Sequence, residues 1–580
     1  MEAVGVCWAF MNGERRMEKE NKVLFALMLA VFAIVACAFI MFDDGDVSAA
    51  DGTWSSEGVT SLSGEGTETN PYKIGTSNEL AFLAEKINAG EVKYVGKYYV
   101  LVSDIDLAGK EWMPIGTKDK PFAGVFDGKD HKIAGLTIRY VLSSGYEADK
   151  MCMGLFGATS SDVAIGSVLN GYEPDLLKIL DWSKKCAVLK NIVFTDVGIS
   201  VEGQTVGALV GKATNTYIDN VKVESGSLKT MGNSGGVVGF LSGSVVINVS
   251  TEDKYTVGTV DKGGYSIGGI VGAVRDNGNS AIINSTNNAK VDVSITQASA
   301  AGILGNIADT PASTLVYGCV NKGLVSIKAN SHTNGDYLDN SATGIVGHSN
   351  GQLTTSIINC TNHGKISNDG NIKAGSLAGI SKYTAGLISG CVNHGEIVGD
   401  AEIRSGIISH NYMNLVIRNC DNKGEVDATG DAIVADIIGC NQGGITVKDM
   451  VVKSPKEIEK YIPVDFKFSF TIDKITCPKE TTINFNPTKI GTNVTINIID
   501  SLNGSIFKIS KGNGISVCVK GTDVSVLFDG EIEGTTSVNC NNINVKLSEK
   551  SELTRFYLYG DGNDVELSGY IKLKSSTECR

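Results

Sequence analysis

One short motif recurs along the middle of this 580-residue chain, and it constrains the fold more than any other feature. Gly-Gly-Val-Val-Gly at residues 235–239 returns as Gly-Gly-Ile-Val-Gly at 268–272, Ala-Gly-Ile-Leu-Gly at 301–305 and Thr-Gly-Ile-Val-Gly at 343–347. Earlier and weaker copies extend the series from residue 154 to residue 439. A motif repeated at intervals of roughly 30 residues is typical of a solenoid built from stacked units.

A second motif alternates with the first and reads Cys-x-Asn-x-Gly-x-aliphatic. Its copies begin at Cys319, Cys360, Cys391 and Cys420, and Ser285 begins a degenerate copy. Because asparagine and glycine tolerate positive φ, Asn-x-Gly predicts a turn. The Gly-Ile-Val-Gly segments are rich in β-branched residues and predict short strands.

A unit made of short strands and tight turns cannot bury its apolar face alone, but stacked copies bury it against their neighbours. The abundance of glycine (69 residues) and the scarcity of proline (9 residues) suit tight turns. No helical periodicity accompanies the repeat. We therefore predict an all-β fold, a right-handed parallel β-helix, with equivalent residues of successive coils about 4.8 Å apart.

The Gly-Gly-aliphatic-Val-Gly copies resemble the GLUG motif, and the resemblance covers about residues 150–440. GLUG repeats occur in exported bacterial and archaeal proteins, including adhesin-like proteins and parts of immunoglobulin A peptidases. The resemblance implies export and contact with other surfaces or glycans, and it names no ligand. Five upstream segments also resemble the start of β-helical surface proteins: Asn70–Ile74, Tyr99–Leu107, Trp112–Gly116, Phe122–Gly128 and His131–Ile138.

The first fifty residues predict an export segment that is not part of the fold. Val23–Phe42 is an uninterrupted apolar run, and its 20 residues are enough to span a bilayer as a helix. Basic residues precede the run and acidic residues follow it, so the positive-inside bias places the rest of the chain outside the cytoplasm. Small residues around Ala49 also offer a cleavage site. Two interpretations stay open: an uncleaved transmembrane anchor, and a signal peptide cleaved near Ala49.

The rest of the chain divides into four predicted parts: a cap with the first coils (51–140), a protruding insertion (141–186), the repeat β-helix (187–450) and a β-rich C-terminal region (451–580). Thr76 and Glu79 have capping-box spacing and Gly90 follows, so we expect a helix over residues 77–89 that covers the first coil. The C-terminal strands fit further coils or a separate β-sandwich, and the sequence leaves both open.

The cysteine and histidine patterns favour structural roles. The chain has 13 cysteines and no CxxC pair, so the four motif cysteines predict an inward-facing ladder of small thiols instead of a metal centre. Cys152 and Cys186 flank the insertion and are the best disulfide candidates. No metal or cofactor site is predicted at the histidines that occupy matching repeat positions: His363 with His394, which we expect in exposed turns, and His348 with His410, which one intervening copy separates.

Two further patterns also have a structural explanation. Six aromatic residues near the predicted cap could stack against sugars, but we expect them to pack under the helix: Tyr94, Tyr98, Tyr99, Trp112, Phe122 and Phe126. Ser234 lies in a Gly-Asn-Ser-Gly-Gly segment that mimics a serine-hydrolase signature, without the histidine and aspartate partners that catalysis needs.

We predict a cell-surface, adhesin-like binding protein that is not an enzyme. Its net charge of −13 repels nucleic acid, so the expected partners are surface glycans or proteins of other cells or of the envelope, with the membrane contacted through Val23–Phe42. The alternative is a β-helical polysaccharide lyase or hydrolase, which needs clustered carboxylates. The nearest candidates are Asp104, Asp106, Asp127 and Asp130, which we expect to serve turns and a solvated face.

Overall fold

A computed structural model of the chain describes residues 52–140, 152–202, 205–259, 266–275, 278–295, 299–308, 313–329, 340–349, 355–370, 373–382, 386–411, 413–479, 481–499, 504–520, 524–567 and 572–573. The predicted export segment Val23–Phe42 lies outside these ranges. Within them, no helix is long and apolar enough to cross a membrane.

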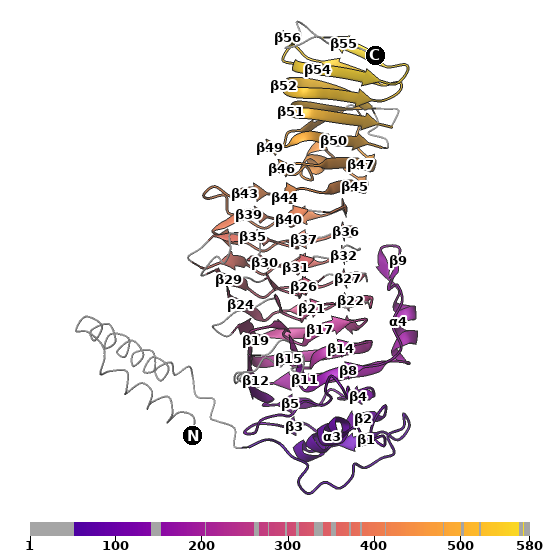
Figure 1. The fold of residues 1–580 in the computed structure, drawn as a ribbon, viewed down its shortest axis with the longest axis vertical. Helices are drawn as coiled ribbons and strands as arrows, with labels where there is room; N and C mark the ends of the chain where they lie inside the picture. Colours follow the sequence, from indigo (N-terminus) through magenta and orange to yellow (C-terminus); the bar gives the residue numbers. More distant parts are fainter. Residues whose placement is uncertain are drawn as a thin grey trace, which may run out of the picture. The chain divides into compact units, whose positions relative to one another are not determined.

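The described chain from residue 52 onward is a right-handed parallel β-helix, which confirms the predicted fold class (Figure 1). One coil illustrates the plan. β27 (Thr314–Tyr317), β28 (Val320–Asn321) and β29 (Val325–Ala329) form one side, β30 (Ser341–Thr343) forms the second and β31 (Val346–Ser349) the third. The next coil pairs with this one in parallel and in register, for example Val316 with Ile357. Equivalent side chains therefore stack in columns along the coils.

The first side of the coils is the largest sheet, with 35 strands in the described residues. Its remaining strands up to residue 300 are β1 (Tyr72–Ile74), β2 (Tyr98–Leu101), β3 (Ile105–Asp106), β4 (Val125–Asp127), β5 (Lys132–Ala134), β6 (Thr137–Tyr140), β11 (Ala187–Thr195), β12 (Val197–Val201), β15 (Thr216–Thr230), β18 (Val245–Ile247), β19 (Ser250–Thr259), β22 (Ser280–Ile283), β23 (Thr286–Asn287) and β24 (Lys290–Ile295). Its later strands are β32 (Thr355–Ile358), β33 (Thr361–Asn362), β34 (Ile366–Asn368), β36 (Gly386–Ser389), β37 (Val392–Asn393), β38 (Ile397–Gly399), β41 (Leu415–Arg418), β42 (Asp421–Asn422), β45 (Gly444–Val451), β47 (Ser469–Thr476), β48 (Thr482–Phe485), β50 (Thr492–Ile498), β51 (Ser505–Val519), β52 (Val524–Asn539), β53 (Asn544–Leu547), β54 (Glu552–Tyr559), β55 (Asp564–Leu567) and β56 (Lys572–Leu573).

Shorter strands make the other two sides. The second side contains β7 (Cys152–Met153), β13 (Thr205–Val206), β16 (Asn233–Gly235), β20 (Ser266–Gly268), β25 (Ser299–Ala301), β35 (Ala374–Ala378), β39 (Ala401–Ser405) and β43 (Ile433–Ala435). The third contains β8 (Phe156–Ser160), β14 (Val210–Thr214), β17 (Val238–Ser242), β21 (Val271–Val274) and β26 (Leu304–Ile307), followed by β40 (Ile408–Asn411), β44 (Ile438–Asn441), β46 (Asp465–Phe466) and β49 (Lys489–Ile490).

Helix α3 (Ser77–Ala89) covers the first coil, as the sequence predicts. Thr76 and Glu79 form the capping box, and Gly90 ends the helix in the left-handed conformation with φ 74°. The helix buries Leu80, Leu83 and four neighbouring apolar side chains against the first coil. This cap protects an apolar cross-section that would otherwise face solvent.

The Gly-Ile-Val-Gly motif forms a corner between two strands and is not itself a strand, which corrects the prediction. In the copy at 343–347, β30 ends at Thr343, Gly344 and Ile345 turn the chain, and β31 begins at Val346. A Cβ on Gly344 would lie 2.1 Å from the carbonyl oxygen of Gly379 in the next coil. Glycine is needed because successive coils approach closely at the corner.

The Asn-x-Gly motif forms a turn, as predicted, but for a different reason. Positive φ occurs at the residue before the motif cysteine, for example 53° at Asn359 and 63° at Gly390. The motif asparagine is buried at a strand end, as Asn362 is in β33. The motif glycine again serves close packing, since a Cβ on Gly364 would lie 2.0 Å from the carbonyl oxygen of Gly323.

The C-terminal strands continue the coils and do not form a separate sandwich. β45 pairs in parallel with β47, and the ladder proceeds through β50, β51, β52 and β54 to β56. A short helix, α5 (Pro455–Glu459), interrupts the chain before this region, and Pro455 is at its start. The side chain of Ser454 makes no capping hydrogen bond to this helix.

Candidate binding groove

Within the described part of the predicted insertion, β7 and β8 are ordinary strands of the coils, and residues 161–186 do not protrude but lie along the outer face of the largest sheet. Residues 161–186, which we call the strap, hold the hairpin of β9 (Leu169–Asn170) and β10 (Glu173–Pro174) and the helix α4 (Leu176–Ser183) (Figure 1). Ile179 and Trp182 of α4 are buried in a second apolar core. The sheet contributes outward-facing side chains of six coils to this core: Val188, Tyr217, Val245, Ile283, Leu315 and Ile358 are examples, one from each coil.

Polar contacts fix the tip of the strap to coils far away in the sequence. The Tyr172 hydroxyl donates to Oδ2 of Asp449 over 3.1 Å. The guanidinium carbon of Arg418 lies 4.5 Å from the centre of the Tyr172 ring, in cation–π contact. Glu173 accepts a hydrogen bond from the Tyr317 hydroxyl. The ring of Tyr172 is therefore held in one orientation at the edge of the strap.

A groove of about 660 Å³ opens where the strap ends. Tyr172 forms one wall, and the floor is the outer face of β32, β36, β41, β45 and β47. Parallel register aligns Ser356, Leu387, Val416, Thr446 and Thr471 in one outward column along this floor. Under the strap the same column is apolar, with Val245 and Leu315. Beyond the strap's cover the column is mixed, with Leu387 and Val416 between Ser356 and the hydroxyl side chains of Thr446 and Thr471.

The charges beside the groove are paired. The Lys448 ammonium lines the groove and lies 3.1 Å from Oδ2 of Asp473. Arg418 lies 3.8 Å from Oδ2 of Asp449. Among the described residues that line the groove, none is an aspartate or a glutamate. The groove therefore offers hydroxyl, amide and backbone groups beside an aromatic ring, with little net charge.

Behind this face, the motif asparagines form a continuous ladder inside the coils. Each amide nitrogen donates over 2.8 Å to the amide oxygen of the next asparagine, and each also donates to the carbonyl oxygen two residues later. The ladder starts at Thr251, whose hydroxyl group donates a hydrogen bond to the amide oxygen of Asn287 over 2.6 Å. The members are Asn287, Asn321, Asn362, Asn393 and Asn422. The ladder links three of the coils that build the groove, those of β32, β36 and β41, in fixed register.

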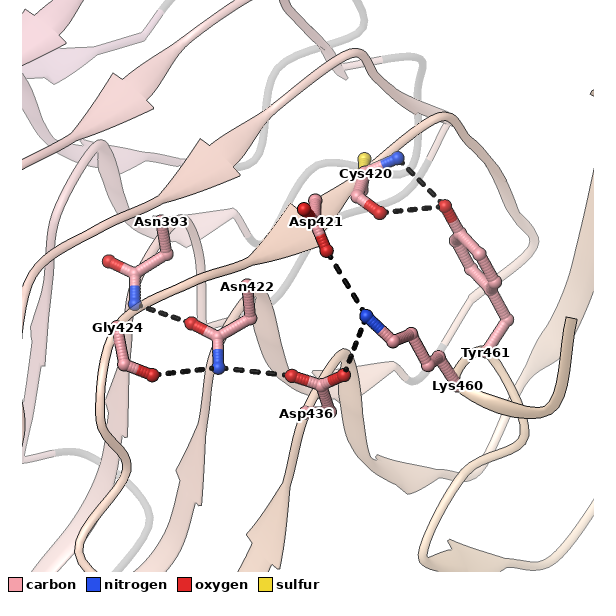
Figure 2. Close-up of polar contacts among 8 residues, drawn as sticks. All are labelled: Asn393, Cys420, Asp421, Asn422, Gly424, Asp436, Lys460 and Tyr461. Atoms are coloured by element: carbon pink, nitrogen blue, oxygen red, sulfur yellow. Dashed lines mark hydrogen bonds and ion pairs between the residues drawn. The ribbon is translucent and has the colours of Figure 1, made fainter. Parts of the chain in front are cut away.

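The ladder ends at a carboxylate (Figure 2). Asn422 donates to Oδ1 of Asp436 over 3.0 Å, and the ammonium of Lys460 bridges Asp436 and Asp421 at 3.4 and 3.2 Å. Asp436 occupies the corner position that glycine holds in the preceding copies, such as Gly406. An aspartate suits the last position because an ionised carboxylate accepts hydrogen bonds and needs no further acceptor.

The motif cysteines also form the predicted inward ladder and are free thiols: Cys319, Cys360, Cys391 and Cys420. Burial raises the pKa of Cys360 and of Cys420, which keeps these thiols protonated. The Tyr461 hydroxyl closes the column by accepting from the Cys420 amide and donating to the Cys420 carbonyl, both at 2.8 Å (Figure 2). Within the described residues, no group of three or more His, Cys, Asp or Glu side chains could hold a metal ion.

The predicted disulfide between Cys152 and Cys186 is wrong, because both thiols are free. The side chain of Cys186 packs in the second apolar core beneath the strap. The sulfur of Cys152 accepts a hydrogen bond from the Thr205 hydroxyl over 3.2 Å. Cys186 therefore packs on the largest sheet, while Cys152 lies on the second side of the coil.

The repeat histidines lie where the sequence predicts. His363 and His394 are exposed in adjacent turns, with ring centres 4.7 Å apart, and burial, His394 and Lys322 lower the pKa of His363. His410 is buried, and its amide donates to the carbonyl of Lys382, which belongs to the coil between His410 and His348. Burial, Lys382 and Lys467 lower the pKa of His410 to about 3.

The four candidate carboxylates of the enzyme alternative serve turns and neighbouring coils. Asp106 accepts from the Ala108 amide and Asp130 from Asn220. A backbone hydrogen bond from Lys132 and the His131 ring lower the pKa of Asp104. Burial raises the pKa of Asp127, but hydrogen bonds from Asn191 and Lys129 outweigh it, so the pKa lies below the usual range.

The remaining candidates pack inside the coils. Tyr94, Tyr99, Trp112, Phe122 and Phe126 are buried in the main core near α3, and Tyr98 is half-buried. Ser234 is fully buried in β16. The residue that sequence reasoning missed is Tyr172, since its partners are more than 200 positions away. The available signal was the run of apolar residues on both faces of the strands near residues 245–358, which predicts a cover on the outer face.

No protein-family model matches the chain. A protein of Evansella cellulosilytica, provisionally named a Gly-rich membrane protein, is 34% identical over 173 residues, and the match covers 28% of this chain. The chain spans 15% of that relative's length. A solved structure from Bacteroides ovatus, provisionally described as an immunoglobulin A1 protease, aligns over 68% of this chain and 88% of its own, with 19% identity and a TM-score of 0.38.

Proposed function

We propose that this chain is a cell-surface, adhesin-like binding protein of the GLUG-repeat kind, which works without catalysis. The proposal has the chain exported, either held at the membrane by Val23–Phe42 or released by cleavage near Ala49. Its partners would be surface glycans or proteins of other cells or of the envelope. The repeat copies, the export segment and the acidic net charge of −13 support this proposal.

The groove at the tip of the strap is the observation that carries the proposal. Its floor comes from successive coils in fixed register, and its wall is an aromatic ring held by Asp449 and Arg418. Its volume of about 660 Å³ falls within the range of small-ligand pockets, roughly 300–1,000 Å³. A rigid, preformed groove suits recognition because little ordering is required when a ligand binds.

The enzyme alternative receives less support from the first coils, which carry its candidate carboxylates. A glycoside hydrolase needs one carboxyl group kept protonated by a raised pKa. Asp104 and Asp127 have lowered pKa values, and their oxygens are occupied by hydrogen bonds within the turn regions. We therefore propose binding as the function and treat polysaccharide cleavage as an outcome to be tested.

The test places a large side chain in the groove. Thr446→Arg fills the floor, and Asn539→Arg is the matched control, because Asn539 is exposed further along the same outward column. The full chain and both variants are screened against arrays of glycans and of extracellular proteins. We expect saturable binding to at least one ligand, lost in Thr446→Arg and kept in Asn539→Arg. Absence of binding, equal loss in both variants, or release of sugar fragments from a polysaccharide would overturn the proposal.

A further inference from the structure

We infer that the groove binds a neutral oligosaccharide, one sugar ring of which stacks on the side chain of Tyr172. This inference rests on the proposed function and assigns the chemical class of its ligand. It follows from three properties of the groove: an aromatic plane with one covered face, a floor with hydroxyl groups at both ends, and charges that are already paired.

The aromatic plane is prepared for stacking. Arg418 covers one face of the Tyr172 ring, and Asp449 accepts a hydrogen bond from the Tyr172 hydroxyl group, so the ring cannot turn freely. The residue is still 39% exposed and lines the groove. The uncovered face is therefore available to a flat, weakly polar surface such as the C–H face of a sugar ring. A preoriented aromatic side chain gives large contact area at little entropic cost.

The floor repeats the chemistry that a sugar chain presents. Ser356 supplies a hydroxyl group at one end of the floor, and Thr446, Ser469 and Thr471 supply hydroxyl groups at the other, while Asn414 supplies an amide between them. Neighbouring coils are about 4.8 Å apart, so the hydroxyl groups of Thr446 and Thr471 lie one coil step from each other. A hydroxyl group can both donate and accept, which matches a ligand whose own hydroxyl groups do the same. A peptide would instead favour deeper apolar pockets than Leu387 and Val416 provide.

The charges favour a neutral ligand over an acidic one. Binding an anion needs an unpaired cation or a cluster of donors. Lys448 is paired with Asp473, and Arg418 with Asp449 and the Tyr172 ring. The chain also carries a net charge of −13, which repels uronic acids, sialic acids and phosphates. A neutral hexose chain meets neither obstacle.

The experiment titrates the full chain with three probes: neutral hexose oligosaccharides, uronic-acid oligosaccharides of the same length, and unstructured peptides. Tyr172→Ala removes the ring, Tyr172→Phe keeps the ring without its hydroxyl, and Tyr559→Ala is the control. Tyr559 is 46% exposed and belongs to the same outward column, in a later coil. Circular dichroism checks that each variant keeps its strand content.

We expect binding of a neutral probe that is unchanged between 50 mM and 500 mM salt. Tyr172→Ala should weaken it about tenfold, which corresponds to about 1.4 kcal/mol, while Tyr172→Phe and Tyr559→Ala stay within about threefold. A preference for uronic acids, a strong salt dependence, or full affinity in Tyr172→Ala would overturn the inference. Binding of peptides alone, abolished by Thr446→Arg, would overturn it while the proposed function stands. If no probe binds in a way that Thr446→Arg abolishes, both the inference and the proposed function are overturned.

Discussion

Replacing one asparagine in the middle of the buried ladder tests the mechanism that holds the coils in register. Asn362 donates to the Gly364 carbonyl over 2.9 Å and to Asn393 over 2.8 Å, and it accepts from Asn321 over 2.8 Å. Asn362→Ala removes all three hydrogen bonds. At about 1 kcal/mol for each, the variant should lose about 3 kcal/mol of local stability.

Asn362→Asp separates hydrogen bonding from side-chain shape. The aspartate has nearly the same size, but its carboxylate cannot donate to the Gly364 carbonyl or to the Asn393 amide oxygen. It also introduces a buried charge, so at neutral pH it should destabilise the coil more than Asn362→Ala does. His363→Ala is the control, because this neighbour lies exposed in the same turn and should change stability by less than about 0.5 kcal/mol.

Hydrogen exchange measured peptide by peptide is the appropriate assay, since stacked repeats open locally as well as globally. Amides of β33 and β37 should exchange faster in both Asn362 variants, while amides of the coils near α3 keep their protection. The reasoning fails if Asn362→Ala behaves like His363→Ala, or if the aspartate is tolerated better than the alanine.

Three further variants test separate parts of the structure. The pKa of His410 is about 3 in the folded chain and near 6.5 in the unfolded chain, so neutral His410 costs no stability above pH 6.5. As the pH drops to 4.5, the free energy of unfolding should fall by about 2–3 kcal/mol. Denaturant unfolding of His410→Gln should therefore be less sensitive to acid, and an unchanged pH profile would contradict this. Ile179→Asp places a charge in the apolar core beneath the strap and should release the strap while the coils stay intact. Limited proteolysis should then cut after residue 160, and resistance to cleavage would show that the strap does not depend on this contact. Asp436→Gly restores the motif glycine, but Asn422 then loses its hydrogen-bond acceptor, so the end of the ladder should lose about 1–3 kcal/mol of stability. A variant more stable than the original chain would refute the role of the carboxylate.

The parts of the fold that sequence predicted depend on local or strictly repeated signals. The helix over 77–89 was found because Thr76, Glu79 and Gly90 act on residues within one turn of themselves. The stacking of coils was found because the repeat itself implies that equivalent residues meet. The inward cysteine ladder follows from the same periodicity.

Sequence reasoning failed where contacts cross between coils without a repeated signal. The glycines of the first motif were assigned to strand ends, although they are needed because carbonyl oxygens of the next coil lie where a Cβ would be, as at Gly344. The partner of each such glycine is about 30 positions away, and spacing alone does not reveal the approach distance. The strap was missed for the same reason, since Tyr172 and Asp449 meet only in the folded chain.

The two repeated motifs depend on each other, which explains why they alternate so regularly. A Cβ on Gly344 would lie 2.5 Å from Cγ of Asn362, so the corner glycine leaves the space that the ladder asparagine occupies. The inward positions are therefore constrained by both motifs, while the outward column carrying Thr446 and Thr471 lies outside the ladder, with a contact of its own where Asn497 donates to the Thr471 hydroxyl over 3.2 Å. It follows that the groove floor can change its chemistry from coil to coil while the register stays fixed, so specificity should be alterable at outward positions without loss of the fold.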